Sequence, residues 1–128
     1  MGLSVVEGEE SIMKLNQSAV KHAKQLIKDG KYVVDSDWSK AQSSAAQENN
    51  YLDEHDWSEY GQWHLGQDSQ EDKDTKGHYG FPYGDFKKVH RSGVIAAKQR
   101  AAQNDYHDIE KAADDLLEMI NEREGIKT

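Results

Sequence analysis

The sequence predicts an all-α protein: a single small domain of four or five helices that ends in an antiparallel helical hairpin. Apolar residues recur at three- and four-residue steps in several segments, which is the spacing of one helix face. Runs of strong strand formers are short, and none has an evident partner to pair with. The chain has 128 residues, 35% of them hydrophobic, which suits one modest core.

The predicted domain covers residues 16–122. Residues 1–15 show no apolar period, and chain ends with few anchors are usually loose, so we expect a flexible lead-in there. Residues 123–128 follow the last apolar stripe and are expected to form a frayed tail.

The first helix is predicted to begin near Asn16 and to end at Gly30, because glycine supplies the left-handed residue that commonly terminates a helix. Residues 31–34 contain good strand formers, but no second run matches them, so we predict a connector. The apolar stripe of this helix is formed by Val20, Ala23, Leu26 and Ile27.

The middle of the chain is less regular. Residues 39–50 are rich in Ser, Gln, Ala and Asn, and their weak periodicity leaves open whether they are helical. Residues 57–65 are predicted to form a helix, because Trp57, Tyr60 and His64 then share one face. Such an aromatic stripe belongs more often to a core than to a cofactor site.

Residues 67–78, with the sequence QDSQEDKDTKGH, contain no apolar residue. A run of this kind buries too little surface to offset the entropy lost on ordering it. We therefore predict a mobile acidic loop at about 67–78.

Residues 79–103 are predicted to form a rigid aromatic turn followed by a tightly packed helix. Pro82, the only proline, lies among three aromatic residues and two glycines, a composition typical of a turn. Asp85 stands where a helix N-cap is expected, so the helix should begin near Phe86. Gly93 and the neighbouring alanines make its apolar face narrow, so another helix can approach closely.

The last helix is predicted to begin at about residue 105. Acidic residues occupy its first turn, where the helix dipole favours negative charge. A short turn joins it to the preceding helix, which predicts the antiparallel hairpin. Its buried face should contain Ile109, Ala112, Ala113, Leu116, Leu117 and Ile120.

Charge is unevenly distributed along a chain whose net charge is −8. Residues 85–100 hold five basic residues against one acidic residue, a local charge of +4. Residues 48–74 hold nine acidic residues against Lys73 alone, a local charge of −8. The two regions are expected to face each other or to steer a partner. The net acidity disfavours general nucleic-acid binding, which needs an excess of basic residues.

A cytoplasmic setting is expected from composition. The sequence contains no cysteine, which fits a reducing compartment, and it has no apolar run near the length of a membrane span.

The leading functional prediction is a small non-enzymatic binding or adaptor module that acts on a protein partner. No Ser-His-Asp order, glycine-rich phosphate loop or nucleophile elbow occurs, and no cofactor is predicted. One alternative is a nucleic-acid-associated accessory protein that uses the basic helix 86–100. Another is a metal-dependent helical-bundle enzyme, for which His22, His64 and His90 are weak candidate ligands.

The predicted partner-binding surface combines the aromatic turn with the basic residues that follow it. Two residues, Asp85 and His90, are predicted to have structural roles, as a cap and as a hydrogen-bonded core residue. The candidate partner-binding residues are Tyr79, Phe81, Tyr83, Lys87, Lys88, Arg91 and Arg100.

The blocks F-P-Y-G-D-F and V-H-R-S-G, with EYGQWHLG upstream and HDIEKAADDLLEMI downstream, carry a family resemblance. Over residues 60–120 the chain resembles a small protein family of bacterial and phage genomes that has no known function. The resemblance implies a bacterial or phage cytoplasmic protein, and it brings no activity, cofactor or catalytic residue with it.

Overall fold

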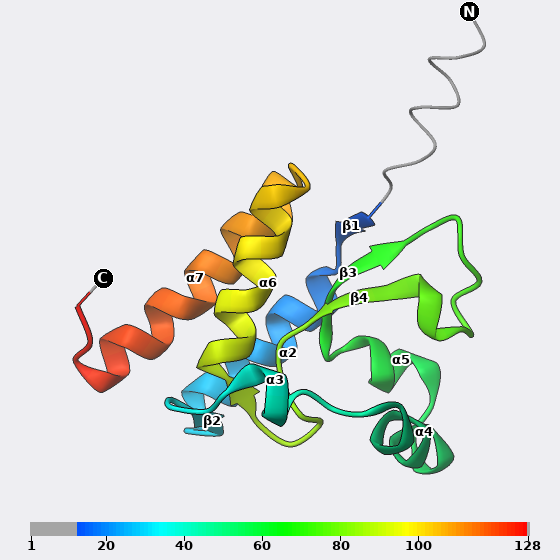
Figure 1. Cartoon of the computed structure of the whole chain (residues 1–128), viewed down its shortest axis with the longest axis horizontal. Helices are drawn as coiled ribbons and strands as arrows, with labels where there is room; N and C mark the ends of the chain where they lie inside the picture. The colour runs from blue at the N-terminus through cyan, green and yellow to red at the C-terminus, as the bar shows by residue number, and fades with distance from the viewer. Residues whose placement is uncertain (1–12, 128) are drawn as a thin grey trace, which may run out of the picture.

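The computed structural model describes residues 13–127 and shows a mixed α/β protein, so the all-α prediction is wrong (Figure 1). Five short strands form two sheets, one with three antiparallel strands and one with two parallel strands. No helix in this part of the chain is long and apolar enough to cross a membrane.

The three-stranded sheet has the order β1-β3-β4, with β1 (Met13–Leu15), β3 (His64–Asp68) and β4 (Tyr79–Pro82). Residues 13–15 of the predicted lead-in thus form a strand, and its residues 1–12 lie outside the described residues. Gly66 shows why the sheet packs closely: an added Cβ would lie 2.8 Å from the Phe81 ring and 2.9 Å from the Met13 side chain.

The two-stranded sheet joins β2 (Tyr32–Val33) to β5 (Val89–His90) in parallel. The sequence predicts a connector at residues 31–34, because it shows no evident strand with which they could pair. The partner is a two-residue strand that lies more than fifty positions away, within the run predicted to be helical. So short a strand carries too weak a pattern to be recognised alone.

Three long helices supply most of the core: α2 (Gln17–Lys28), α6 (Arg91–Gln103) and α7 (His107–Glu124). In Figure 1, α6 and α7 lie side by side as a hairpin, and α2, which contacts α7 and β3, lies between the hairpin and the sheet. Helix α7 ends before Gly125, whose φ of 70° is left-handed, so the predicted tail begins two residues too early. The fully buried apolar side chains include Ile27, Leu65, Val94, Ile109, Leu116 and Ile120.

The segment between β2 and β4 contains short helices: α3 (Trp38–Ala41), α4 (Ala45–Glu54), α5 (Trp57–Gly61) and the 3-10 helix η1 (Lys76–His78). The predicted helix 57–65 is wrong in its second half, because the chain turns after Gly61 and enters β3. The predicted loop 67–78 is shorter than expected, since β3 continues through Asp68 and η1 begins at Lys76.

The turn before α6 differs from the prediction that a helix begins near Phe86. The Asp85 carboxylate accepts hydrogen bonds from the backbone N–H groups of Lys87 and Lys88, at 3.0 and 2.8 Å, and closes a turn. Phe86 has a φ of 68°, a left-handed conformation that is costly for a bulky residue. Its ring stacks on Tyr51 with centroids 4.3 Å apart, so packing offsets the backbone strain.

We expect Phe86→Gly to be more stable than Phe86→Ala by about 1 kcal/mol, because both variants lose the ring and only glycine tolerates the left-handed φ. Chemical denaturation of the two variants measures this difference. Lys87 is the matched control, because it is exposed and its φ is not in the left-handed region. At this position the alanine variant should be at least as stable as the glycine variant. Equal stability of the two Phe86 variants would show that φ is not strained in solution.

Gly93 allows a close contact on α6, and its neighbours are the short helix α3 and the backbone of Tyr83. A Cβ at this position would lie 2.8 Å from Trp38 of α3 and 2.9 Å from the backbone oxygen of Tyr83. Real Cβ contacts are essentially never shorter than 3.0 Å, and the Tyr83 carbonyl is held by its hydrogen bond from the His90 N–H.

Gly93→Ala is expected to lower the free energy of unfolding by about 1–3 kcal/mol, because overpacking outweighs the better helix propensity of alanine. Thermal and urea unfolding measure the change. Gln99→Ala, at an exposed position of the same helix, should stay within about 0.5 kcal/mol of the parent protein. A Gly93→Ala variant as stable as the parent would contradict the close contact.

Candidate functional site

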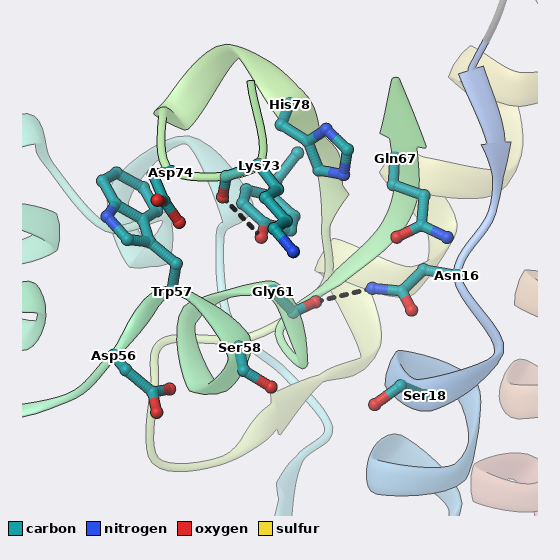
Figure 2. Close-up of a pocket in the computed structure, with 11 residues that line it drawn as sticks. Asn16, Ser18, Asp56, Trp57, Ser58, Gly61, Gln67, Lys73, Asp74 and His78 are labelled. Atoms are coloured by element: carbon teal, nitrogen blue, oxygen red, sulfur yellow. Dashed lines mark hydrogen bonds between the residues drawn. The ribbon is translucent and has the colours of Figure 1, made fainter. Parts of the chain in front are cut away.

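A groove of about 510 Å³ lies where α2, α5, β3 and residues 72–79 meet. We call it the Trp57 groove. Figure 2 shows polar side chains from each of these segments turned toward one hollow. Its lining combines amides, hydroxyls, two carboxylates, a lysine, a histidine and two aromatic rings. Convergence of polar groups beside aromatic surface is typical of a binding site.

Asn16 forms part of the groove wall and is the most constrained polar group there. It is the N-cap of α2, it is 7% exposed, and its backbone N–H donates to the Leu65 carbonyl at 2.8 Å. The side-chain Nδ2 donates to the carbonyls of Gly61 and His64, at 2.9 and 3.1 Å. These bonds orient the carboxamide, and Oδ1, which has no hydrogen-bond partner within residues 13–127, turns toward Ser18 (Figure 2).

Trp57 and Tyr79 supply the aromatic surface of the groove. Their rings are nearly parallel, with an interplanar angle of 7° and centroids 6.3 Å apart. Tyr60 packs its edge against both rings from the core side, at 5.4 and 5.6 Å. The Tyr79 hydroxyl donates to the Lys73 carbonyl at 2.9 Å, which ties the 72–79 segment over the groove.

Charge is divided within the groove. Figure 2 shows Asp56 and Asp74 on the Trp57 side, while the Lys73 ammonium group turns into the hollow. Burial, followed by the negative fields of Asp74 and Asp56, raises the pKa of Tyr79 above its ordinary value. The lining of the groove therefore holds two carboxylates and one lysine.

The predicted partner-binding aromatics separate in the structure. Tyr79 lines the Trp57 groove, but Phe81 and Tyr83 are 8% and 0% exposed and belong to the core. The prediction that they present their rings to a partner is wrong, because Phe81 packs against Tyr106 and Tyr83 against Trp63.

The basic residues of the predicted surface also do not form one helix face. Lys87 and Lys88 are exposed on the turn before α6, whereas Arg100 is exposed near the end of that helix. Arg91 is half-buried, and its Nε donates to Asn121 of α7 at 2.8 Å. The fifth basic residue of the run, Lys98, pairs with Asp114 at 2.7 Å. A continuous basic helix for nucleic acid is therefore not present at 86–100.

The candidate metal ligands His22, His64 and His90 do not form a metal centre. Among the described residues, no group of three or more histidine and carboxylate side chains could hold a metal ion. His64 Nδ1 lies 2.9 Å from the Tyr60 carbonyl, and His22 packs edge-on against Trp63.

His90 belongs to a hydrogen-bonded chain that the sequence order does not reveal. Its Nε2 lies 2.9 Å from Asp85 Oδ2, its Nδ1 lies 2.8 Å from Ser36 Oγ, and Ser36 Oγ lies 2.9 Å from Ser92 Oγ. Burial alone would raise the pKa of Asp85, but hydrogen bonds from His90 and from the Lys88 and Lys87 N–H groups outweigh burial and lower it.

We interpret this serine–histidine–aspartate chain as structural. His90 is 6% exposed and both of its ring nitrogens are engaged, so the chain links the segment after β2 to the first turn of α6. The Ser36 hydroxyl is shared with Ser92, and the Asp85 carboxylate also closes the turn before α6. Each member therefore has a packing role.

Sequence reasoning identified Tyr79 but missed the other groove residues. Two signals were available: Asn16 immediately precedes a helix, and Lys73 is the single basic residue within the acidic region 48–74. Neither signal reveals that the two residues line the same hollow. Their separation of 57 positions is closed by the pairing of β1 with β3.

Acid titration of His64 should destabilise the fold. Burial disfavours the charged ring and lowers its pKa from 6.5 to about 4, although the bond to the Tyr60 carbonyl acts in the opposite direction. The neutral ring is favoured in the folded state, so the unfolded state binds more protons below pH 6.5. We expect the free energy of unfolding to fall by up to about 3 kcal/mol between pH 6.5 and pH 4.

Urea titrations at several pH values, on the parent protein and on His64→Gln, measure this effect. The variant should lose less stability across the same window, because it lacks the titrating ring. His107→Gln, whose side chain is 76% exposed, should behave like the parent. The contribution of Asp85 is lost mainly below this window, because its pKa is lowered from the ordinary value of 3.8. A His64→Gln variant with the parent pH dependence would contradict the assignment.

Comparison with protein-family models, with curated protein sequences and with solved structures found no match to this chain. The family resemblance carried by the F-P-Y-G-D-F and V-H-R-S-G blocks therefore stays a prediction.

Proposed function

We propose that this chain is a small non-enzymatic binding module that holds a segment of a partner protein in the Trp57 groove. One observation carries the proposal. A buried carboxamide, oriented by two hydrogen bonds, and two nearly parallel aromatic rings line the same hollow. Such pre-orientation lowers the cost of ordering the site when a ligand binds.

A peptide segment suits this lining better than a purely apolar ligand. Peptides expose both N–H and C=O groups, and the groove offers donors and acceptors together through Asn16, Gln67 and two serine hydroxyls. Trp57 and Tyr79 provide rigid surface for a side chain at low entropic cost. The volume of about 510 Å³ lies within the range of small-ligand sites and suits a few residues.

The serine hydroxyls of the groove are its candidate nucleophiles, and their lack of an activating partner in the described part of the chain favours a binding role over catalysis. Within the described residues, neither Ser18 nor Ser58 is hydrogen-bonded to a histidine or a carboxylate that would activate it. The His78 ring lies against the Glu71 carbonyl, with Nδ1 at 2.8 Å, and so helps to order the loop. We further propose a cytoplasmic protein of bacterial or phage origin, a setting that the lack of cysteine supports.

Selection from a random peptide display library, with the full chain as bait, tests the proposal. We expect enriched peptides that bind with Kd values of about 1–100 μM, a range typical of short segments in small grooves. Trp57→Ala should weaken binding at least about tenfold, because it removes the main aromatic contact. Binding is measured by fluorescence anisotropy of the synthesised peptides.

A blocking variant separates groove binding from other surfaces. Ser18→Arg places a long side chain in the hollow from an exposed helix position, and it should abolish binding of the selected peptides. Ala102→Arg introduces the same side chain at an exposed position of α6 and should leave binding unchanged. Peptides that bind equally well to both variants, or a library that yields no binder, would overturn the proposal.

A further inference from the structure

We propose that the Trp57 groove receives a lysine or arginine side chain of the partner, and that Lys73 of this chain occupies the same site until the partner displaces it. This inference rests on the proposed function and names the chemistry of the partner. It also gives Lys73 a definite role, that of a built-in competitor for the site.

Three polar residues around the hollow, Asn16, Asp74 and Asp56, offer hydrogen-bond acceptors. Asn16 Oδ1 is held in place and free to accept. The Asp74 carboxylate has no salt-bridge partner in the described part of the chain. One oxygen of Asp56 caps the Glu59 N–H at 2.8 Å, which leaves the other available. Ammonium and guanidinium groups are pure donors and match this set.

The aromatic surface favours the same ligand. The faces of tryptophan and tyrosine attract a cation that lies within about 6 Å of the ring. Trp57 and Tyr79 are nearly parallel, and Tyr79 lies within the electrostatic reach of Asp74 and Asp56, so a cation at these rings is also near negative charge. An arginine or lysine stem can pack on the rings while its charged end meets the carboxylates.

Lys73 shows that the groove accommodates a long basic side chain. Its ammonium group turns into the hollow, while its backbone carbonyl is held by the Tyr79 hydroxyl at 2.9 Å (Figure 2). Across residues 13–127 the ammonium group has no carboxylate within 4.0 Å, so no ion pair locks it there. An occupant that is tethered but not paired can be displaced, and it lowers the apparent affinity of a competing cation.

Charge on the surrounding surface supports a basic partner. Residues 48–74 carry a local charge of −8, and one of their glutamates, Glu48, pairs with Lys76 at 3.2 Å. A field of this sign raises the rate at which a basic segment arrives and lowers that of an acidic one.

Small amino-acid amides test the chemistry directly on the full chain. The probes are Nα-acetyl-arginine amide, its neutral isostere Nα-acetyl-citrulline amide, and Nα-acetyl-glutamate amide. Binding is followed by NMR shifts of the Trp57 indole N–H and the Gly61 amide. The arginine probe should produce saturable shifts of both signals and bind at least about fivefold more tightly than the citrulline probe, because only arginine carries the positive charge that the ring faces attract.

Two charge variants are expected to change the affinity of the arginine probe in opposite directions. Asp74→Asn should weaken the arginine probe about two- to fivefold, the effect of losing one exposed opposite charge. Lys73→Met keeps the length of the side chain but removes its charge, and it should strengthen the arginine probe about twofold or more. Lys28→Met, at the exposed far end of α2, removes the same charge away from the groove and should change nothing there.

The inference would be overturned if the order of probe affinities and the effect of Lys73→Met were both reversed. If the glutamate probe binds more tightly than the arginine probe and Lys73→Met weakens it, the groove takes an acidic group and Lys73 is its ligand. If displayed peptides bind the groove without enrichment of lysine or arginine, this inference fails and the proposed function stands. If the arginine probe binds but no peptide does, the proposed function fails alone.

Discussion

The rest of the structure depends on the hydrogen bonds that Asn16 forms. Its backbone N–H reaches Leu65 of β3, and its side chain reaches the carbonyls of Gly61 and His64. One residue thus joins the β1–α2 junction to the junction between α5 and β3. A buried amide is stable only when it is hydrogen-bonded, so this connection also fixes the orientation of the Asn16 side chain at the groove wall.

The aromatic cluster connects the groove to the rest of the fold. Tyr60 touches Trp57 and Tyr79 on the groove side and approaches Phe86 on the other, with ring centroids 5.7 Å apart. Phe86 reaches this cluster through a left-handed backbone, and Gly93 allows Trp38 to lie against the start of α6. Aromatic burial of this kind compensates for short strands and a modest aliphatic core.

Electrostatic pairing follows the tertiary structure rather than the charge blocks of the sequence. Basic residues of the 85–100 region bond to α7, where Lys98 meets Asp114 and Arg91 meets Asn121. The acidic region 48–74 therefore does not pair extensively with the basic run. This differs from the expectation that the two regions face each other. Most of its carboxylates are exposed, and two of them, Asp56 and Asp74, line the Trp57 groove.

The sequence by itself determined the long helices and their buried faces, because apolar stripes and a terminal glycine act locally within α2 and α7. Tertiary structure decided the two sheets, since strands of two to five residues have too few positions to show a period, and β2 becomes a strand only when β5 lies beside it. The same holds for the candidate site. Tyr79 could be recognised from composition, but Asn16 and Lys73, 57 positions apart, line one groove because β1 pairs with β3, an arrangement that no local pattern encodes.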